Sequence, residues 1–168
     1  GPIFFDFCDR LHHYLAAHAG PDPPSALLYM ARAGLRLRYL YELYCQVQQT
    51  VPVLEGKDFY ASRWSVAKGC LEGDFDYVLP IVVQCYGHAD LASLARSLLG
   101  PAAELPPAWA TMPLTADSIR TLYQSDEPAG RAARDYFARQ ASLLSRYVAG
   151  LVGDCRRVFL VDSGWMGK

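Results

Sequence analysis

The spacing of apolar residues predicts a helix at the start of the chain and a βα unit after it. Residues 3–19 place apolar side chains at three- and four-residue steps and end at Gly20-Pro21, which predicts an amphipathic helix. Residues 26–31 form a short, continuously apolar run, which is typical of a buried parallel strand. A second helix is expected from about Arg36 to Gln49, because apolar residues recur there at helical spacing.

A second strand and helix are expected to follow this unit. Residues 58–62 predict a short strand, and a helix capped by Ser62 is expected to begin at Arg63. Trp64 on that helix is either a packing anchor or a face on which a ligand stacks, and packing is favoured. Arg63 and Lys68 are candidate anion contacts because a basic residue again follows a strand directly.

Residues 72–153 predict a large helical insertion. The segment 75–86 is apolar and contains Pro80, so it is either a bent helix or a buried strand, and a helix is preferred. Further helices are expected at 90–99, at 115–123 with Thr115 as the N-cap, and at 127–152, where apolar residues recur at three- and four-residue steps.

The last stretch of the chain predicts a buried strand that ends in an acid and a glycine-rich turn. Residues 158–161 are all apolar, Asp162 follows them, and Gly164 and Gly167 allow backbone N–H groups to converge on one point. Such a turn suits a sugar phosphate, because amides cradle phosphate oxygens and a carboxylate binds ribose hydroxyls or a metal. A plain core strand that runs into a loop explains the spacing about equally well.

Charged residues therefore follow each of the three expected strands. The first strand is followed by a loop with Arg32, Gly34 and Arg36, in which two arginines and free amides could hold a diphosphate. Solvated charges at a helix start are the alternative interpretation of these arginines. The coincidence of charges with strand ends favours an α/β domain that handles a phosphate.

Composition narrows the class of protein. An apolar content of 52% with 20% charged residues is typical of a folded domain, and a net charge of −1 argues against a broad nucleic-acid surface. Five scattered cysteines without a CxxC pair fit reduced cytoplasmic thiols better than a disulfide framework. No apolar run approaches the length of a transmembrane helix. We expect a single α/β domain over residues 1–168, as a part of a longer chain.

Three short segments together resemble a bacterial family attached to polysaccharide biosynthesis proteins. These segments are YMARAGL at 29–35, YASR at 60–63 and LVDSGWMG at 160–167. They are similar to the ARDG turn, YxSR strand and VDxGWxGT turn of that family, in the same order. Its members are often labelled haloacid-dehalogenase-like hydrolases. Those hydrolases need an aspartate nucleophile in a DxD pair, whereas this chain has Ala33 in the first turn and Ser163-Gly164 after Asp162.

The same order of elements is similar to type I phosphoribosyltransferases. The resemblance implies a small parallel sheet of that type with a helical insertion, and 5-phosphoribosyl diphosphate with Mg²⁺ as the ligand. It implies that Asp162 faces the ribose hydroxyls and the metal, and that Ser163 stands where a second acid is usual. The other roles it implies are diphosphate binding by Arg32, Ala33, Gly34 and Leu35, charge neutralisation by Arg63 and Lys68, and a 5-phosphate loop begun by Gly164, Trp165, Met166, Gly167 and Lys168.

Three functional hypotheses follow. The first is a phosphoribosyltransferase-like glycosyltransferase that transfers 5-phosphoribose to a sugar acceptor of a bacterial surface polysaccharide, such as an O antigen or a capsule. The second is a hydrolase-like sugar-phosphate phosphatase of the same pathway. The third is a non-catalytic module of a larger transferase, which binds other polysaccharide-assembly domains; Ala33 and Ser163 favour it, because both replace acids that a catalyst needs.

Overall fold

The computed structural model describes residues 1–20, 22–86 and 90–162 and divides the chain into two compact units. The first unit comprises residues 1–61 and the chain from Val148 onward, and the second comprises residues 62–147. The chain passes from one unit to the other after residue 61 and again inside the long helix α7 (Pro128–Val152). Within the described ranges, no helix is both long enough and apolar enough to cross a membrane.

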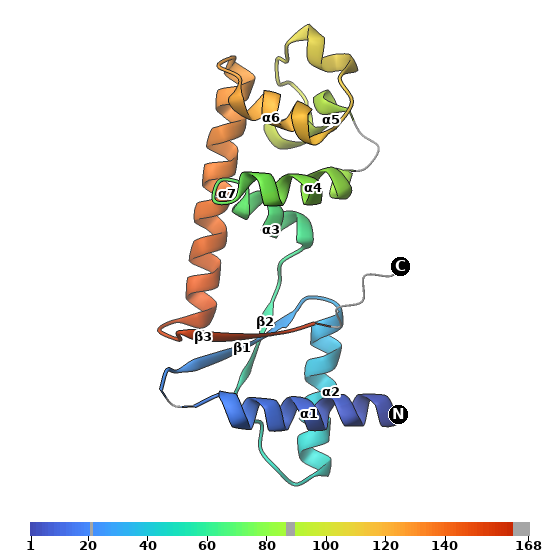
Figure 1. The fold of residues 1–168 in the computed structure, drawn as a ribbon, viewed down its shortest axis with the longest axis vertical. Coiled ribbons are helices and arrows are strands. Elements are labelled where there is room, and N and C mark those ends of the chain that lie inside the picture. Colours follow the sequence, from blue (N-terminus) through green and yellow to red (C-terminus); the bar gives the residue numbers. More distant parts are fainter. Residues whose placement is uncertain (21, 87–89, 163–168) are drawn as a thin grey trace. The chain divides into compact units, whose positions relative to one another are not determined.

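The first unit is a small parallel sheet with two helices, which confirms the expected α/β class (Figure 1). The sheet has the order β2-β1-β3, with β1 (Ser25–Met30) in the centre, β2 (Gly56–Phe59) on one side and β3 (Arg157–Val161) on the other. Helices α1 (Pro2–His18) and α2 (Ala33–Val47) complete the unit. Both neighbours of β1 run parallel to it, so all three strands end at the same edge of the sheet.

Helices α1 and α2 cover one face of this sheet (Figure 1). Successive side chains of a strand point to opposite faces of the sheet. Leu27 and Tyr29 of β1 therefore lie on the same face, and both pack against α1 and α2. Two free cysteines, Cys8 of α1 and Cys45 of α2, are buried in the same core, and burial raises the pKa of both thiols. Apolar burial between the helices and the strands is therefore what fixes α1 and α2 on the sheet.

The expectation of a buried last strand is wrong. In β3 only Val161 is buried, whereas Val158 is 43% and Leu160 is 63% exposed. The reason is the strand order: β3 pairs with β1 on one side, and among the described residues no strand pairs with its other side. An apolar run cannot distinguish an edge strand from a central one, because both bury at least part of one face.

Two elements begin two or three residues before their expected starts. Strand β2 occupies Gly56–Phe59 rather than 58–62, and its first residue lies so close to β1 that a Cβ on Gly56 would come within 2.3 Å of the Tyr29 ring. Helix α2 begins at Ala33 rather than near Arg36. Arg32 has a positive φ of 72°, which turns the chain away from β1, and α2 starts at the next residue.

The second unit is helical, as expected for most of it. It contains α3 (Arg63–Cys70), α4 (Phe75–Tyr86), α5 (Leu91–Leu99), a 3₁₀ turn η1 (Pro107–Thr111), α6 (Ala116–Gln124) and most of α7. The preference for a helix at 75–86 is confirmed, with Pro80 inside it. One apolar core joins all of these elements, and its fully buried members include Leu79, Leu94, Ile119 and Phe137.

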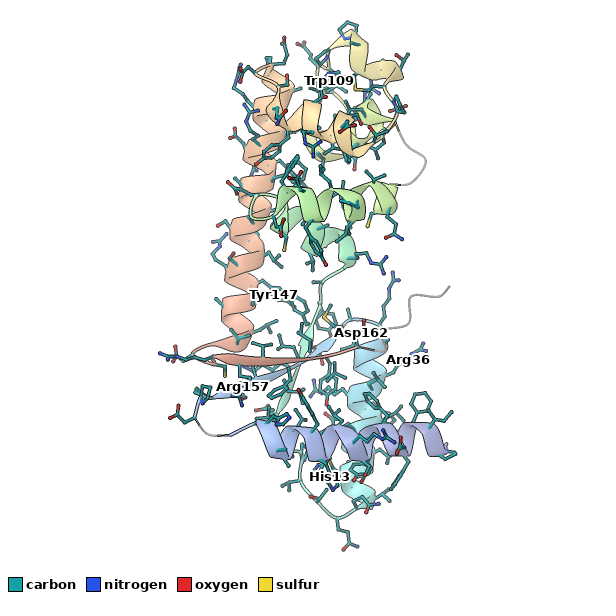
Figure 2. All side chains as sticks on the ribbon, viewed as in Figure 1. His13, Arg36, Trp109, Tyr147, Arg157 and Asp162 are labelled. Atoms are coloured by element: carbon teal, nitrogen blue, oxygen red, sulfur yellow. The ribbon has the colours of Figure 1, made fainter. Side chains whose placement is uncertain are left out.

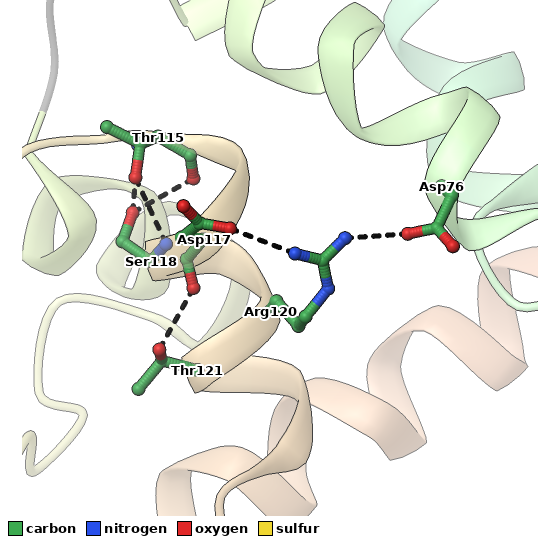
Figure 3. A network of polar contacts seen from close by, with 6 residues as sticks. All are labelled: Asp76, Thr115, Asp117, Ser118, Arg120 and Thr121. Atoms are coloured by element: carbon green, nitrogen blue, oxygen red, sulfur yellow. Dashed lines mark hydrogen bonds and ion pairs between the residues drawn. The ribbon is translucent and has the colours of Figure 1, made fainter.

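Side-chain caps define where the helices of this unit begin. The Thr115 hydroxyl accepts from the Ser118 amide at 3.1 Å, and the Ser118 hydroxyl accepts from the Thr115 amide at 2.8 Å, which confirms the expected cap as a reciprocal capping box. Arg120 then donates to Asp117 of its own helix and to Asp76 of α4 (Figure 3). This arginine therefore connects α4 with α6.

Candidate functional site

The candidate site is the edge of the sheet at which the three strands end. In the ladder Met30 pairs with Phe59 and Tyr29 pairs with Val161, so Ala31, Tyr60 and Asp162 are the next residues at this edge. The chain passes from β1 to β2 on one side, and β3 lies on the other side of β1. Open α/β sheets bind ligands outside the carboxyl ends of their strands where the strand order reverses, which here is between β1 and β3.

Helix α2 approaches this point with its backbone. A Cβ atom placed on Gly34 would lie 2.6 Å from the Val161 carbonyl oxygen and 3.0 Å from the Tyr29 carbonyl carbon. Contacts this short leave no room for a side chain, so glycine is the residue that lets the first turn of α2 meet the ends of β1 and β3. Gly34 is thus a packing residue of the site, and a ligand contact would come from its backbone amide.

Arg32 connects β1 to α2 in a strained conformation. Its φ of 72° and ψ of −91° lie outside the regions that a residue with a Cβ atom usually occupies. Such backbone outliers are enriched at ligand sites, where the surrounding structure holds them in place. The side chain is exposed and does not cap the helix, because a guanidinium has no acceptor for the first amides of α2. Backbone amides in the first turn of a helix can bind an anion, so those of Ala33 to Leu35 are candidate anion contacts.

The two other charged candidates of this unit lie nearby. Figure 2 shows Arg36 and Asp162 by the end of α2 at which the helix begins, in agreement with the contact of Gly34 and Val161. Both side chains are exposed. Among the expected ligand residues, the structure therefore brings together the Arg32 loop, the first turn of α2 and Asp162. Residues Ser163 to Lys168, which carry the expected 5-phosphate loop, lie outside the described residues.

Arg63 and Lys68 belong to the second unit, on α3. Ser62 caps this helix through a 3.0 Å bond from the Ser65 amide, as expected, and Arg63 is exposed in its first turn. The Lys68 ammonium donates to the Tyr136 hydroxyl at 3.0 Å and lies 5.3 Å from the centre of the Trp64 ring. Trp64 packs against the helical core, which confirms the packing interpretation. Lys68 therefore has a structural role in joining α3 to α7.

A polar network at the β2 side of the sheet was not expected from the sequence. The Arg38 guanidinium donates to Asp58 at 2.7 Å and to Glu42 at 2.8 Å, and the Tyr60 hydroxyl donates to Asp58 at 3.0 Å. The spacing of Arg38 and Glu42 is the one available signal, because residues four apart meet on a helix. Tyr60, an exposed phenol at the end of β2, is thus a further polar group at the candidate edge.

This network makes stability depend on pH in acid. The hydrogen bond from Arg38 lowers the pKa of Asp58 below its usual value, so its stabilisation is complete above the pKa of the unfolded chain and is lost as the pH falls through the folded pKa. We expect Asp58→Asn to cost up to about 1 kcal/mol of unfolding free energy at pH 7 and much less near pH 3, measured by urea denaturation. An Asp6→Asn control, from the exposed pair with Arg10, is expected to change stability less. A cost for Asp58→Asn that stays equal at both pH values would contradict this assignment.

No protein-family model, curated protein or solved structure matches this chain.

Proposed function

We propose that this protein is a phosphoribosyltransferase-like glycosyltransferase. It transfers 5-phosphoribose from 5-phosphoribosyl diphosphate to a sugar acceptor during the synthesis of a bacterial surface polysaccharide in the cytoplasm. The observation that supports this most is the arrangement at the strand ends. A strained, exposed arginine and uncapped helix amides follow β1, and a carboxylate follows β3, on the two sides of the point where the strand order reverses.

Each group has a distinct role in this proposal. Arg32 and the amides of Ala33, Gly34 and Leu35 bind the diphosphate, with Arg36 as a second cation. Asp162 accepts hydrogen bonds from the ribose hydroxyls. The acceptor hydroxyl forms a bond to C1 of the ribose as the bond from C1 to the diphosphate breaks. The diphosphate takes the bonding electrons, its oxygens accept the proton that the hydroxyl releases, and Arg32 stabilises the charge that develops on it.

A magnesium ion fits this arrangement as a companion of the diphosphate. Among the described residues, no group of three or more His, Cys, Asp and Glu side chains is placed to hold a metal ion. Magnesium is commonly bound by one or two carboxylates together with substrate phosphates, which needs only Asp162 from this chain. When bound, it offsets the negative charge of the diphosphate.

Two further cations expected from the sequence, Arg63 and Lys68, lie on α3 of the helical unit. Arg63 begins α3 directly after the segment that follows β2, with an exposed side chain, and it is the residue that we expect to neutralise departing charge. Lys68, the other expected cation, already donates to Tyr136, so its contribution is expected to be smaller. Other polysaccharide-assembly domains are the expected macromolecular partners.

Calorimetric titration with 5-phosphoribosyl diphosphate and Mg²⁺ tests the proposal. We expect binding in the micromolar range that weakens about tenfold to a hundredfold in Arg32→Ala and Asp162→Ala, because each variant removes hydrogen bonds to or from a charged group. The control Arg139→Ala removes an exposed arginine of α7 and is expected to leave binding unchanged.

Three results would contradict the proposal. If the heat of binding is the same in Arg32→Ala and Asp162→Ala as in the original chain, the strand ends are not the ligand site. Absence of binding together with release of inorganic phosphate from a sugar phosphate would favour the phosphatase. If the ligand binds but no phosphoribose reaches any glycan acceptor, the domain is a non-catalytic module.

A further inference from the structure

Among the residues that the structure describes, no strand pairs with the outer edge of β3, so its outward-facing backbone groups can pair with another strand. The Arg157 amide donates to the Pro24 carbonyl at 3.4 Å, on the side of β1. Backbone groups of successive residues alternate between the two sides of a strand, so those of Phe159 and Val161 also face β1. The N–H and C=O groups of Val158 and Leu160 therefore face outward. Such an edge is a template for another strand.

Two side chains along this edge, Val158 and Leu160, are apolar and accessible, whereas Arg157 at the start of the strand is charged and donates to the His18 carbonyl. Val158 and Leu160 point to the face opposite α1 and α2, since Phe159 and Val161 pack into the core under those helices. Natural edge strands usually carry charged side chains or proline at such positions, which prevents unwanted pairing. Val158 and Leu160 carry no such protection, which points to a partner for this edge.

The charges at the two ends of β3 specify that partner. Exposed Arg156 precedes the strand and exposed Asp162 follows it. If a second β3 pairs antiparallel about a two-fold axis at Phe159, Val158 lies opposite the partner's Leu160 and Arg156 lies opposite the partner's Asp162. Each contact then occurs twice, as symmetry requires. In this register the outward-facing groups of Val158 and Leu160 exchange hydrogen bonds with their counterparts.

We propose that two copies of this chain pair through β3 in this antiparallel register and form one continuous sheet across a two-fold axis. A pocket of about 530 Å³ lines the same edge on the α1 side, between Tyr14, Ala17 and His18 of α1 and the start of β3. In this register the incoming strand places its Phe159 opposite Phe159 and its Val161 opposite Arg157, so these are the partner residues beside the pocket. The dimer does not depend on the proposed function, because its test measures only mass.

Sedimentation equilibrium of the whole chain tests the dimer. The interface consists of one strand pair and its flanking side chains and is therefore small. A dissociation constant on the order of 10 µM is expected for it. Arg156→Asp alone and Asp162→Arg alone each create two like-charge contacts and are expected to raise that constant at least roughly tenfold. The double variant Arg156→Asp with Asp162→Arg restores opposite charges in both contacts and is expected to bring the constant back toward the original value.

Replacing apolar residues with lysine tests the dimer independently of the charge reversals. Leu160→Lys places a cation at the centre of the interface and is expected to give a monomer. Leu43→Lys changes another exposed leucine, on α2, and is expected to leave the dimer intact. Circular dichroism of each variant verifies its fold. A chain that stays monomeric at about 200 µM overturns the proposal, and that result would assign the edge to a different occupant. The proposal is also overturned if neither charge reversal changes the dissociation constant, or if Leu43→Lys disrupts the dimer.

Discussion

Replacing Phe137 with alanine is expected to lower the free energy of unfolding by about 3–5 kcal/mol. The side chain is 1% exposed in the core of the helical unit. Its ring centre lies 5.7 Å from that of Tyr136 and 6.3 Å from that of Tyr123, so the truncation removes aromatic contacts and leaves a cavity. Urea denaturation followed by circular dichroism measures the loss.

The matched control is Tyr77→Ala, which removes an aromatic side chain that is 72% exposed on α4. Its effect is expected to stay within about 0.5 kcal/mol, because it leaves no cavity. A cost below about 1 kcal/mol for Phe137→Ala would mean that α7 does not pack into this core as described.

The second large effect is expected at the candidate site. Gly34→Ala adds a methyl group 2.6 Å from the Val161 carbonyl oxygen, so α2 or the end of β3 has to move. Overpacking of this kind typically costs about 1–3 kcal/mol. In this case the neighbours are backbone atoms of two strands, which cannot adopt another rotamer. Thermal and urea unfolding of the variant measure this cost.

Gly150→Ala is the matched control, because Gly150 lies in a helix as well and a Cβ atom there meets nothing within 4 Å. The control is expected to stabilise the chain by about 0.4–1 kcal/mol, through the lower conformational entropy of the unfolded state. If Gly34→Ala behaved like this control, the close approach of α2 to the strand ends would be refuted.

Local signals in the sequence predicted the helices well. Ser62, Asp90 and Thr115 each precede a helix and each accept a bond from an amide in its first turn, as the N-cap pattern predicts. The end of α7 at Gly153 was also predictable, because glycine is common directly after a helix, where it readily adopts a positive φ. In the structure Gly153 has a φ of 56°. These features depend on residues a few positions apart, and a sequence shows such neighbours directly.

The strands were harder to predict because their limits are set by distant residues. β2 is half polar: Asp58 is held by Arg38 of α2, and Lys57 donates to the Leu151 carbonyl at the end of α7. A polar edge strand has no apolar period for a sequence to reveal. The same limit applies to β3, whose apolar residues indicated burial although the strand order leaves two of them exposed.

The candidate site was predictable in part. Charges at Arg32 and Asp162 follow strands that prove to be parallel neighbours, so the expected proximity of these two chain segments agrees with the sheet order. The role of Gly34 in close packing, and the use of Tyr60 in the Arg38 network, depend on contacts across the fold. Such contacts become visible only once the register is known.

The burial of Cys8 of α1 and Cys45 of α2 in one core gives the sheet unit an intrinsic reporter of its own opening. Both thiols are inaccessible in the folded state and have raised pKa values, so a reagent that attacks thiolates reaches them only when α1 lifts from the sheet. Cys70 and Cys85 of the helical unit are exposed and do not require such an opening. The rate of the slower thiol reaction therefore measures how often α1 separates from its core, in the folded protein and without denaturant.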